Sequence, residues 1–308
     1  MLRHMLRIRL FLILAPVAIG QPLATGPELP HRVVKDWAKL PVGWNFGETS
    51  GVATDRSDNV WVFNRGPHGV LQFDKNGKML QAWNEVPITS AHGMKVDPSG
   101  NVWAIDVAGH MLFQFSPEGR IKMVLGNAGK APGNNETTDA YNKPTAVSFL
   151  PDGGFYVADG YVNSRVLKYD REGIFQLKWG TKGAGDGQFE LVHDVALDNQ
   201  GRVYVADRGN ERVQVFDRNG KYITKWTGLG APWGLAFAAK ENVFYMCDGK
   251  NNRIVQVNLD GQILGVLSGY GKVQGRLDYP HHIAVDSEGS IYVAEIKNWR
   301  VQKFAVPK

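Results

Sequence analysis

The sequence is nearly free of cysteine. Cys247 is the only one in 308 residues, so the chain has no internal disulfide. It lies in the run ENVFYMCDG, whose apolar neighbours predict a small buried side chain rather than a reactive thiol. The stability of the fold must therefore come from packing and hydrogen bonding.

Long apolar runs are also missing. The run LFLILAPVAI is shorter than the roughly 20 residues that a membrane-spanning helix needs. It follows the basic start MLRHMLRIR and precedes small residues before Gln21, which is the pattern of an export signal. The sequence thus predicts residues 1–20 as a signal peptide, a secreted or periplasmic protein, and no stable membrane anchor after signal removal.

A strong charge of one sign is absent as well. The formal net charge is +5, and it falls to +2 when Arg3, Arg7 and Arg9 leave with the signal. No basic stripe of the kind that binds nucleic acid is present. We therefore expect no nucleic-acid partner, a small-molecule or peptide substrate, and a monomer.

What the sequence does contain is a repeat. Six segments share a short strand, a polar turn and a second strand: SGVATDRSDNVWVFNRG, HGMKVDPSGNVWAIDVAG, TAVSFLPDGGFYVADGY, HDVALDNQGRVYVADRG, WGLAFAAKENVFYMCDG and HHIAVDSEGSIYVAEIK. They recur every 40 to 53 residues, with further strands such as RVLKYDREGIFQLKW between them. A solenoid would need a shorter repeat, whereas this period with four strands per unit is typical of a propeller blade. The sequence predicts an all-β, six-bladed β-propeller with four-stranded antiparallel blades.

The ends of the chain suggest how the ring closes. The sixth repeat lacks an outermost strand, and RVVKDWAKL at residues 32–40 lies before the first blade. This N-terminal segment is predicted to supply the missing strand and so to remove an open edge. The expected organisation is a signal at 1–20, an N-terminal segment at 21–43 and the propeller at 44–308.

One position of the repeat stands out. The first strand of each blade lines the central channel, so equivalent positions face each other across the axis. The position five residues before the aligned Asp55 is an inner column with the members Ser50, His92, Thr145, His193, Trp233 and His281. Histidine occupies the second, fourth and sixth blades, about 120° apart in a closed ring.

Three converging imidazoles with an open fourth position are the ligands of a catalytic zinc ion. Imidazole also suits iron, copper or nickel, so zinc or another divalent transition metal is expected. The alternative is a polar channel whose histidines are satisfied by hydrogen bonds alone. The next column contains mostly small residues, with Asp194 and His282 as its only polar members.

The residues also resemble a known family, the peptidyl-α-hydroxyglycine α-amidating lyases, over about residues 44–304. The resemblance rests on VATDRSDNVWVFNRG, AHGMKVDPSGNVWAIDVAGHMLFQF, PTAVSFLPDGGFYVADGYVNSRVLKY, HDVALDNQGRVYVADRGNERVQVF and PHHIAVD. It implies a six-bladed NHL-repeat propeller that cleaves the N–C bond of a C-terminal α-hydroxyglycine. The products would be a peptide amide and glyoxylate.

The resemblance also implies roles for single residues. The family's zinc ligands match His92, His193 and His281, and its catalytic tyrosine and two substrate-binding arginines match Tyr161, Arg65 and Arg208. The alternative for Arg65 is an ion pair with Asp106 or another acid, and the alternative for Tyr161 is ordinary packing at the rim of the channel.

A structural calcium ion in the family is held by backbone carbonyls that match Val52 and Met94 and by an aspartate after the third histidine. That aspartate is His282 here, and an imidazole cannot replace a hard oxygen ligand. Calcium binding is therefore expected only if Asp194 or water supplies the missing oxygen. The family's methionine two residues before the third histidine is Tyr279. Two other functions remain open, a non-enzymatic binding module and a metal-dependent hydrolase on the same fold.

Overall fold

The computed structural model describes residues 23–128 and 134–307. The predicted export signal at 1–20 lies outside the described residues. Within the part of the chain that is described, no helix is long and apolar enough to span a membrane.

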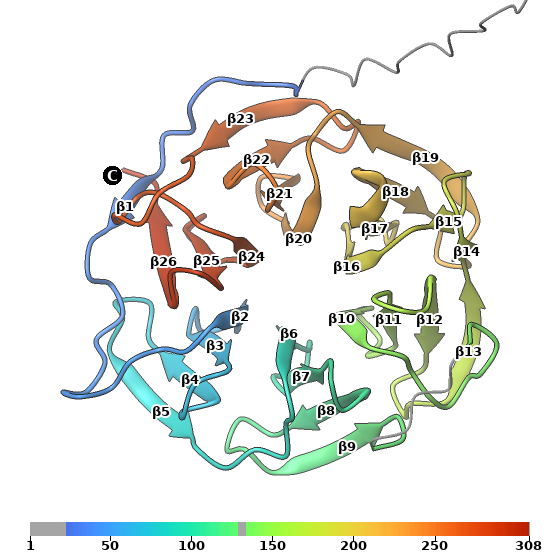
Figure 1. Ribbon diagram of the computed structural model, residues 1–308, viewed down its shortest axis with the longest axis horizontal. Coiled ribbons are helices and arrows are strands. Elements are labelled where there is room, and N and C mark those ends of the chain that lie inside the picture. Colours follow the sequence, from blue (N-terminus) through green and yellow to red (C-terminus); the bar gives the residue numbers. More distant parts are fainter. Residues whose placement is uncertain (1–22, 129–133, 308) are drawn as a thin grey trace, which may run out of the picture.

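Six four-stranded antiparallel sheets are arranged radially around a central channel (Figure 1), as the repeat predicted. The first blade contains β2 (Thr49–Thr54), β3 (Val60–Asn64), β4 (Val70–Phe73) and β5 (Met79–Trp83). The second contains β6 (Ala91–Val96), β7 (Val102–Asp106), β8 (Met111–Phe115) and β9 (Ile121–Leu125). The third contains β10 (Pro144–Phe149), β11 (Phe155–Asp159), β12 (Arg165–Tyr169) and β13 (Phe175–Trp179). The next two contain β16 (Val192–Leu197), β17 (Val203–Asp207), β18 (Arg212–Phe216), β19 (Tyr222–Thr227); β20 (Pro232–Ala238), β21 (Val243–Asp248), β22 (Arg253–Val257) and β23 (Ile263–Leu267).

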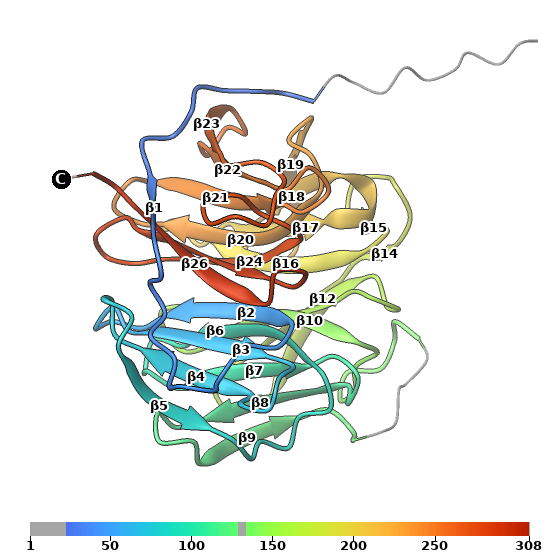
Figure 2. The same cartoon turned by 60° about the vertical axis from the view of Figure 1, so that its left-hand side comes forward.

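The sixth blade closes the ring with an N-terminal strand. It consists of β24 (Pro280–Val285), β25 (Ile291–Glu295), β26 (Arg300–Ala305) and, outermost, β1 (Arg32–Val34). β1 pairs antiparallel with β26, with Val33 opposite Phe304. The closing strand that the sequence predicted within residues 32–40 is therefore confirmed, although only its first three residues form strand. Figures 1 and 2 both place β2 beside β24, so the first and last blades are neighbours.

Small elements lie in the longer connections. β14 (Thr181–Lys182) and β15 (Gln188–Phe189) form a short parallel pair after the third blade, and the 3-10 helix η1 (Arg208–Asn210) follows β17. η1 places Arg208 directly after a central strand, at the mouth of the channel where the inner column lies.

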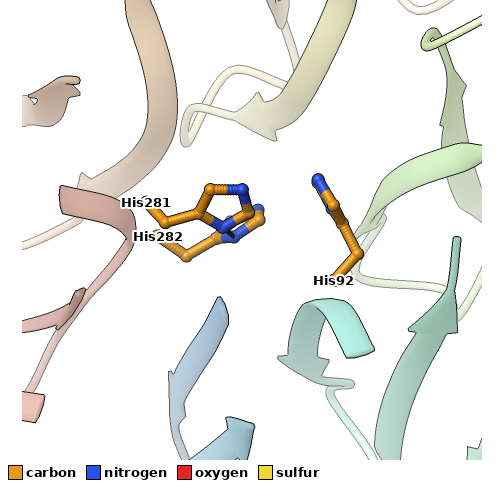
Figure 3. Close-up of side chains that lie close together, drawn as sticks. All are labelled: His92, His281 and His282. Atoms are coloured by element: carbon orange, nitrogen blue, oxygen red, sulfur yellow. Dashed lines mark hydrogen bonds between the residues drawn. The ribbon is translucent and has the colours of Figure 1, made fainter. Parts of the chain in front are cut away.

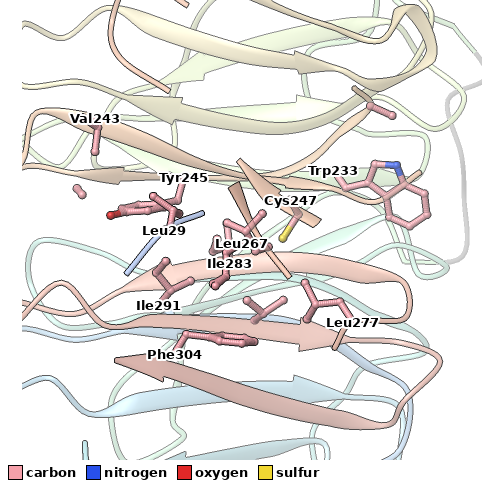
Figure 4. Packing of buried hydrophobic residues seen from close by; sticks show 14 residues of the cluster. Leu29, Trp233, Val243, Tyr245, Cys247, Leu267, Leu277, Ile283, Ile291 and Phe304 are labelled. Carbon is pink, nitrogen blue, oxygen red and sulfur yellow. The ribbon is translucent and has the colours of Figure 1, made fainter. Parts of the chain in front are cut away.

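Apolar side chains fill the spaces between adjacent blades. Figure 4 shows the cluster between the fifth and sixth blades, where Tyr245, Ile283 and Phe304 pack together. Cys247 belongs to this cluster and is fully buried and unpaired, as the sequence predicted. Because each blade packs on two neighbours, the six inner strands are held at fixed positions around the channel.

A repeated ion-pair motif fixes the loops outside the second and third strands. Asp159 accepts hydrogen bonds from Asn163 and Arg165, and the Arg165 guanidinium also donates to backbone carbonyls of the loop before β10, including that of Ala140. The same Asp–Asn–Arg arrangement recurs in the next two blades, and with glutamate in the last: Asp207, Asn210, Arg212; Asp248, Asn251, Arg253; Glu295, Asn298, Arg300. The acid, asparagine and arginine of this motif are therefore structural. Tyr161, two residues after Asp159, and Arg208, directly after Asp207, instead contact each other.

Candidate metal centre

The inner column lies at a β-bulge in all six blades. Where the first strand of each blade starts to pair with the second, the register skips: between Thr49 and Gly51 in the first blade, and between Pro280 and His282 in the last. Equivalent shifts occur in the four other blades. A bulge inserts one unpaired residue and turns its side chain away from the regular alternation. This explains why one column of side chains points into the channel mouth.

The three column histidines form a nearly equilateral triangle. Their ring centroids are 4.9 Å apart for His92 and His193, 4.7 Å for His92 and His281, and 4.8 Å for His193 and His281. All three side chains are buried, with 1% exposure or less. The residues that the sequence placed 120° apart thus meet on the axis.

Each of these histidines is oriented by the next blade. The Nδ1 atom of His92 lies 2.7 Å from the carbonyl oxygen of Thr145, and Nδ1 of His193 contacts the carbonyl of Trp233. Nδ1 of His281 lies 2.7 Å from the carbonyl of Ser50. A carbonyl can only accept, so each Nδ1 carries the proton and each Nε2 keeps its lone pair.

This pattern suits a transition metal. Burial lowers the pKa of His92, His193 and His281 well below the ordinary histidine value, and each is lowered further by a neighbouring histidine. The rings are therefore neutral at pH 7, and a neutral imidazole anchored through Nδ1 to a carbonyl is the usual metal ligand. The donor set fits the zinc or related ion expected from the sequence.

His282 also belongs to the cluster, which sequence reasoning did not assign. Ligand nitrogens of His92, His281 and His282 all lie within 4.8 Å of one another, and His193 is not part of that group. Figure 3 shows the rings of His281 and His282 side by side, facing His92 across the channel. The bulge between Pro280 and His282 allows two consecutive side chains to face the same channel. In the sequence, the adjacent pair His281–His282 was the feature that could have predicted this second imidazole in the channel.

The second imidazole of the pair is not fully satisfied. Nδ1 of His282 lies 2.7 Å from the same Ser50 oxygen that His281 uses, and 2.9 Å from Nδ1 of His281. Its Nε2 atom is buried and has no hydrogen-bond partner among the described residues. His92, His193 and His281 remain the expected ligand set because they occupy the same position of the repeat, although His281 and His282 share the carbonyl of Ser50.

Tyr161 lies directly over this cluster. Its hydroxyl is 3.1 Å from Nε2 of His92 and 3.3 Å from Nε2 of His193. Nη1 of Arg208 lies 3.5 Å from the same hydroxyl, and its guanidinium stacks on the Trp233 ring at 4.5 Å. Burial raises the pKa of Tyr161, and the positive charge of Arg208 opposes that rise. The contacts of the Arg208 guanidinium among the described residues are the Tyr161 hydroxyl and the Tyr161 and Trp233 rings, and none is with a carboxylate.

Arg65 lies at the edge of the cluster and is already paired. Its Nη1 atom is 2.8 Å from a carboxylate oxygen of Glu48, and its Nε donates to the carbonyl of Ala91, the residue before His92. Asp106 instead accepts three backbone N–H groups, from Thr89, Ser90 and Gly109. The ion-pair interpretation thus holds with Glu48 as the acid, and Arg65 is still close enough to lower the pKa of His92.

The layer below the histidines, which contains Asp194 and His282, does not suit calcium. Val52 and Met94 are fully buried there, but the family's carboxylate ligand is replaced by His282. The Nζ atom of Lys95 lies 3.1 Å from the carbonyl of Leu235 and 3.7 Å from a carboxylate oxygen of Asp194. Both oxygens of Asp194 also accept backbone N–H groups. An ammonium group and an imidazole are poor neighbours for a hard divalent cation.

Comparison with known proteins places the chain in a family. Residues 130–307 match the family described as SMP-30/gluconolactonase/LRE-like region. The chain is 32% identical to NHL repeat-containing protein 3 of Homo sapiens, over 96% of this chain and 92% of that protein. It is 29% identical to peptidyl-alpha-hydroxyglycine alpha-amidating lyase 1 of Drosophila melanogaster, over 94% of this chain and 49% of that protein.

Other matches bear on the architecture. Peptidyl-glycine alpha-amidating monooxygenase B of Xenopus laevis is 27% identical over 94% of this chain, which corresponds to 38% of that longer protein. Among solved structures, a streptogramin B lyase superposes with a TM-score of 0.64 over 85% of this chain and 95% of the other, at 12% identity. At that identity, the likeness supports the fold alone.

Proposed function

Because the chain belongs to the SMP-30/gluconolactonase/LRE-like family and is an NHL-repeat propeller, we propose that it is an exported, metal-dependent lyase acting on C-terminal α-hydroxyglycine. The reaction would give a peptide amide and glyoxylate. The observation that carries the proposal is the triangle of His92, His193 and His281 with the Tyr161 hydroxyl over it. A binding platform has no need of three convergent, neutral imidazoles.

The chemistry is the cleavage of a carbinolamide. The substrate hydroxyl loses its proton, its oxygen forms a carbonyl, the C–N bond breaks, and the nitrogen gains a proton to become the amide. A divalent ion held by the three Nε2 atoms would lower the pKa of the substrate hydroxyl and stabilise its charge. The remaining tasks, which are binding the carboxylate and moving the proton, fall to side chains of this protein.

Tyr161 is suited to handle the proton because its hydroxyl contacts Nε2 of both His92 and His193. Its raised pKa means that the phenol keeps its proton at neutral pH unless a nearby cation favours the phenolate. Arg208 is suited to bind the glycine carboxylate, since it has no carboxylate partner among the described residues and a guanidinium offers two parallel donors. Arg65 contributes positive charge beside His92 while staying paired with Glu48.

The direct test uses the mature protein loaded with zinc and an α-hydroxyhippurate substrate, with glyoxylate and benzamide measured together. We expect stoichiometric formation of both products, loss of at least about 100-fold in kcat for Tyr161→Phe, and mainly a raised KM for Arg208→Ala. His68→Ala is the matched control, because His68 stacks on Trp44 away from the cluster. A metal-loaded protein that forms no glyoxylate would refute the proposal.

The second candidate is a non-enzymatic binding module. It stays open because the chain matches 92% of NHL repeat-containing protein 3, a relative whose name states a repeat and no reaction. In that case the histidine triangle would bind its metal and no turnover would follow. A metal-dependent hydrolase is separated from both by testing for water-dependent cleavage of esters or lactones.

A further inference from the structure

A pocket opens beside the histidine cluster, between the fifth and sixth blades. It has a volume of about 400 Å³, and its lining includes Arg208, Trp233, Tyr279 and Lys297. The Trp233 ring lies 5.7 Å from that of His193 and 5.9 Å from that of His281. The pocket therefore adjoins the candidate metal centre through Trp233 and Arg208, although none of the cluster histidines lines it. A larger cavity of about 730 Å³ lies at the opposite mouth, and its lining includes neither Arg208 nor Trp233.

Two aromatic rings form a corner of this pocket. The rings of Trp233 and Tyr279 meet edge to face with centroids 4.3 Å apart. Trp233 is 7% exposed, so its position is set by packing. Tyr279 has a left-handed backbone, with φ of 65°, which a tyrosine rarely adopts. Its N–H donates to the Asn252 side chain and its carbonyl accepts from Ile296, and these bonds hold the ring in place.

The charges around the pocket indicate where a ligand's own charge would lie. Arg208 stacks on Trp233 at the side nearest Tyr161. Lys297 lies over the Tyr279 ring at 5.0 Å, and the buried acid Asp278 also lines the pocket. Lys297 and Asp278 carry opposite charges, and Lys250, which also lines the pocket, is paired with Glu211, whereas Arg208 has no carboxylate partner among the described residues. A carboxylate is therefore favoured at Arg208 and an uncharged group in the aromatic corner.

We propose that this pocket selects substrates with an aromatic group next to the α-hydroxyglycine, which makes Trp233 and Tyr279 the specificity-determining residues. The inference rests on the proposed lyase function. A ligand with its carboxylate on Arg208 projects its acyl side towards the Trp233–Tyr279 corner, where a planar ring gains edge and face contacts. A volume of about 400 Å³ suits the aromatic acyl group of such a ligand. The substrate class is thus an aromatic N-acyl-α-hydroxyglycine, or a peptide with an aromatic residue at that position.

The test measures binding apart from turnover. Hippurate and aceturate are unreactive analogues that lack the α-hydroxyl group and differ only in their benzoyl and acetyl groups. With the zinc-loaded protein, we expect hippurate to bind at least tenfold more tightly by calorimetry. Tyr279→Met, which keeps a similar volume without a ring, and Trp233→Leu should each reduce that ratio to about two or three. Trp299→Leu is the matched control, because Trp299 is 55% exposed and does not line the pocket.

The outcomes separate this proposal from the lyase proposal. Equal affinities for the two analogues, or a preference that survives both substitutions, would overturn the aromatic pocket even if α-hydroxyglycines are cleaved. A preference for hippurate that disappears in Tyr279→Met would support the pocket even if α-hydroxyhippurate is not turned over. A variant that fails to fold is recognised by its loss of bound zinc, and the other substitution then decides.

Discussion

His92 donates its Nδ1 hydrogen to the carbonyl of Thr145, which occupies the same position of the repeat one blade further on. His193 does the same to Trp233 and His281 to Ser50. The histidine blades and the other three thus alternate as donor and acceptor around the channel. This relationship leaves the three Nε2 atoms without a proton, two of them in contact with the Tyr161 hydroxyl, and it uses backbone carbonyls that any residue can supply. The partners can therefore be serine, threonine or tryptophan.

The first prediction concerns the metal. The mature protein should contain one divalent transition-metal ion per chain after loading, and His92→Ala, His193→Ala or His281→Ala should each lose it, because three ligands are the minimum for this centre. Elemental analysis after desalting gives the stoichiometry, with His68→Ala as the control. A wild type that retains no stoichiometric metal would mean that the triangle is a polar channel satisfied by its carbonyl contacts.

The sequence was sufficient to predict the blades, the closing strand and the inner column, because each follows from aligning a repeat that occurs six times in the chain. It was not sufficient for His282 or for the pocket. The bulge that turns both His281 and His282 into the channel arises from strand pairing and leaves no mark in the repeat. The contact between Trp233 and Tyr279 joins two blades, and a repeat alignment carries no information about such contacts.

The second prediction concerns closure. A protein that starts at Gly43 would lose β1, and with it the buried side chains of Leu29 and Trp37, which pack in the clusters on either side of the sixth blade. Losing two such side chains and the edge pairing should lower the free energy of unfolding by about 5 kcal/mol or more. Thermal melting and light scattering measure the effect, and a protein that starts at Leu23 is the control. Unchanged melting of the shorter protein would contradict the role of β1.

The third prediction concerns the repeated ion-pair motif. Arg165 and Asp159 are both fully buried, with Nη2 of the arginine 2.8 Å from the carboxylate. Arg165→Leu leaves a buried carboxylate without its main partner, so we expect a loss of about 3–5 kcal/mol in stability by chemical denaturation. Arg171→Leu removes an exposed pair with Glu172 and should cost less than about 1 kcal/mol. Similar losses of stability in the two variants would show that the buried Asp159–Arg165 pair does not stabilise the fold more than an exposed pair does.

The fourth prediction concerns the layer below the histidines. Lys95 extends from β6 to the Leu235 carbonyl in β20 and approaches Asp194 in β16, so its ammonium group connects three blades across the channel. The wild type should therefore show no change in melting temperature when calcium is added. Lys95→Met alone should be destabilised, because Asp194 then loses its cation.

Converting this layer to a calcium site should need two changes. His282→Asp restores a carboxylate, but the Lys95 ammonium would still repel a divalent cation, so the single variant should respond weakly. His282→Asp combined with Lys95→Met should bind calcium and gain stability by RT ln(1 + [L]/Kd), about 2.7 kcal/mol at a hundredfold excess over Kd. The measurement is thermal melting across a calcium titration, with magnesium as the control ion. If the wild type is already stabilised by calcium, oxygens other than the missing carboxylate must bind the ion. His282 would then be a neighbour of that site, and Lys95 would not be its replacement.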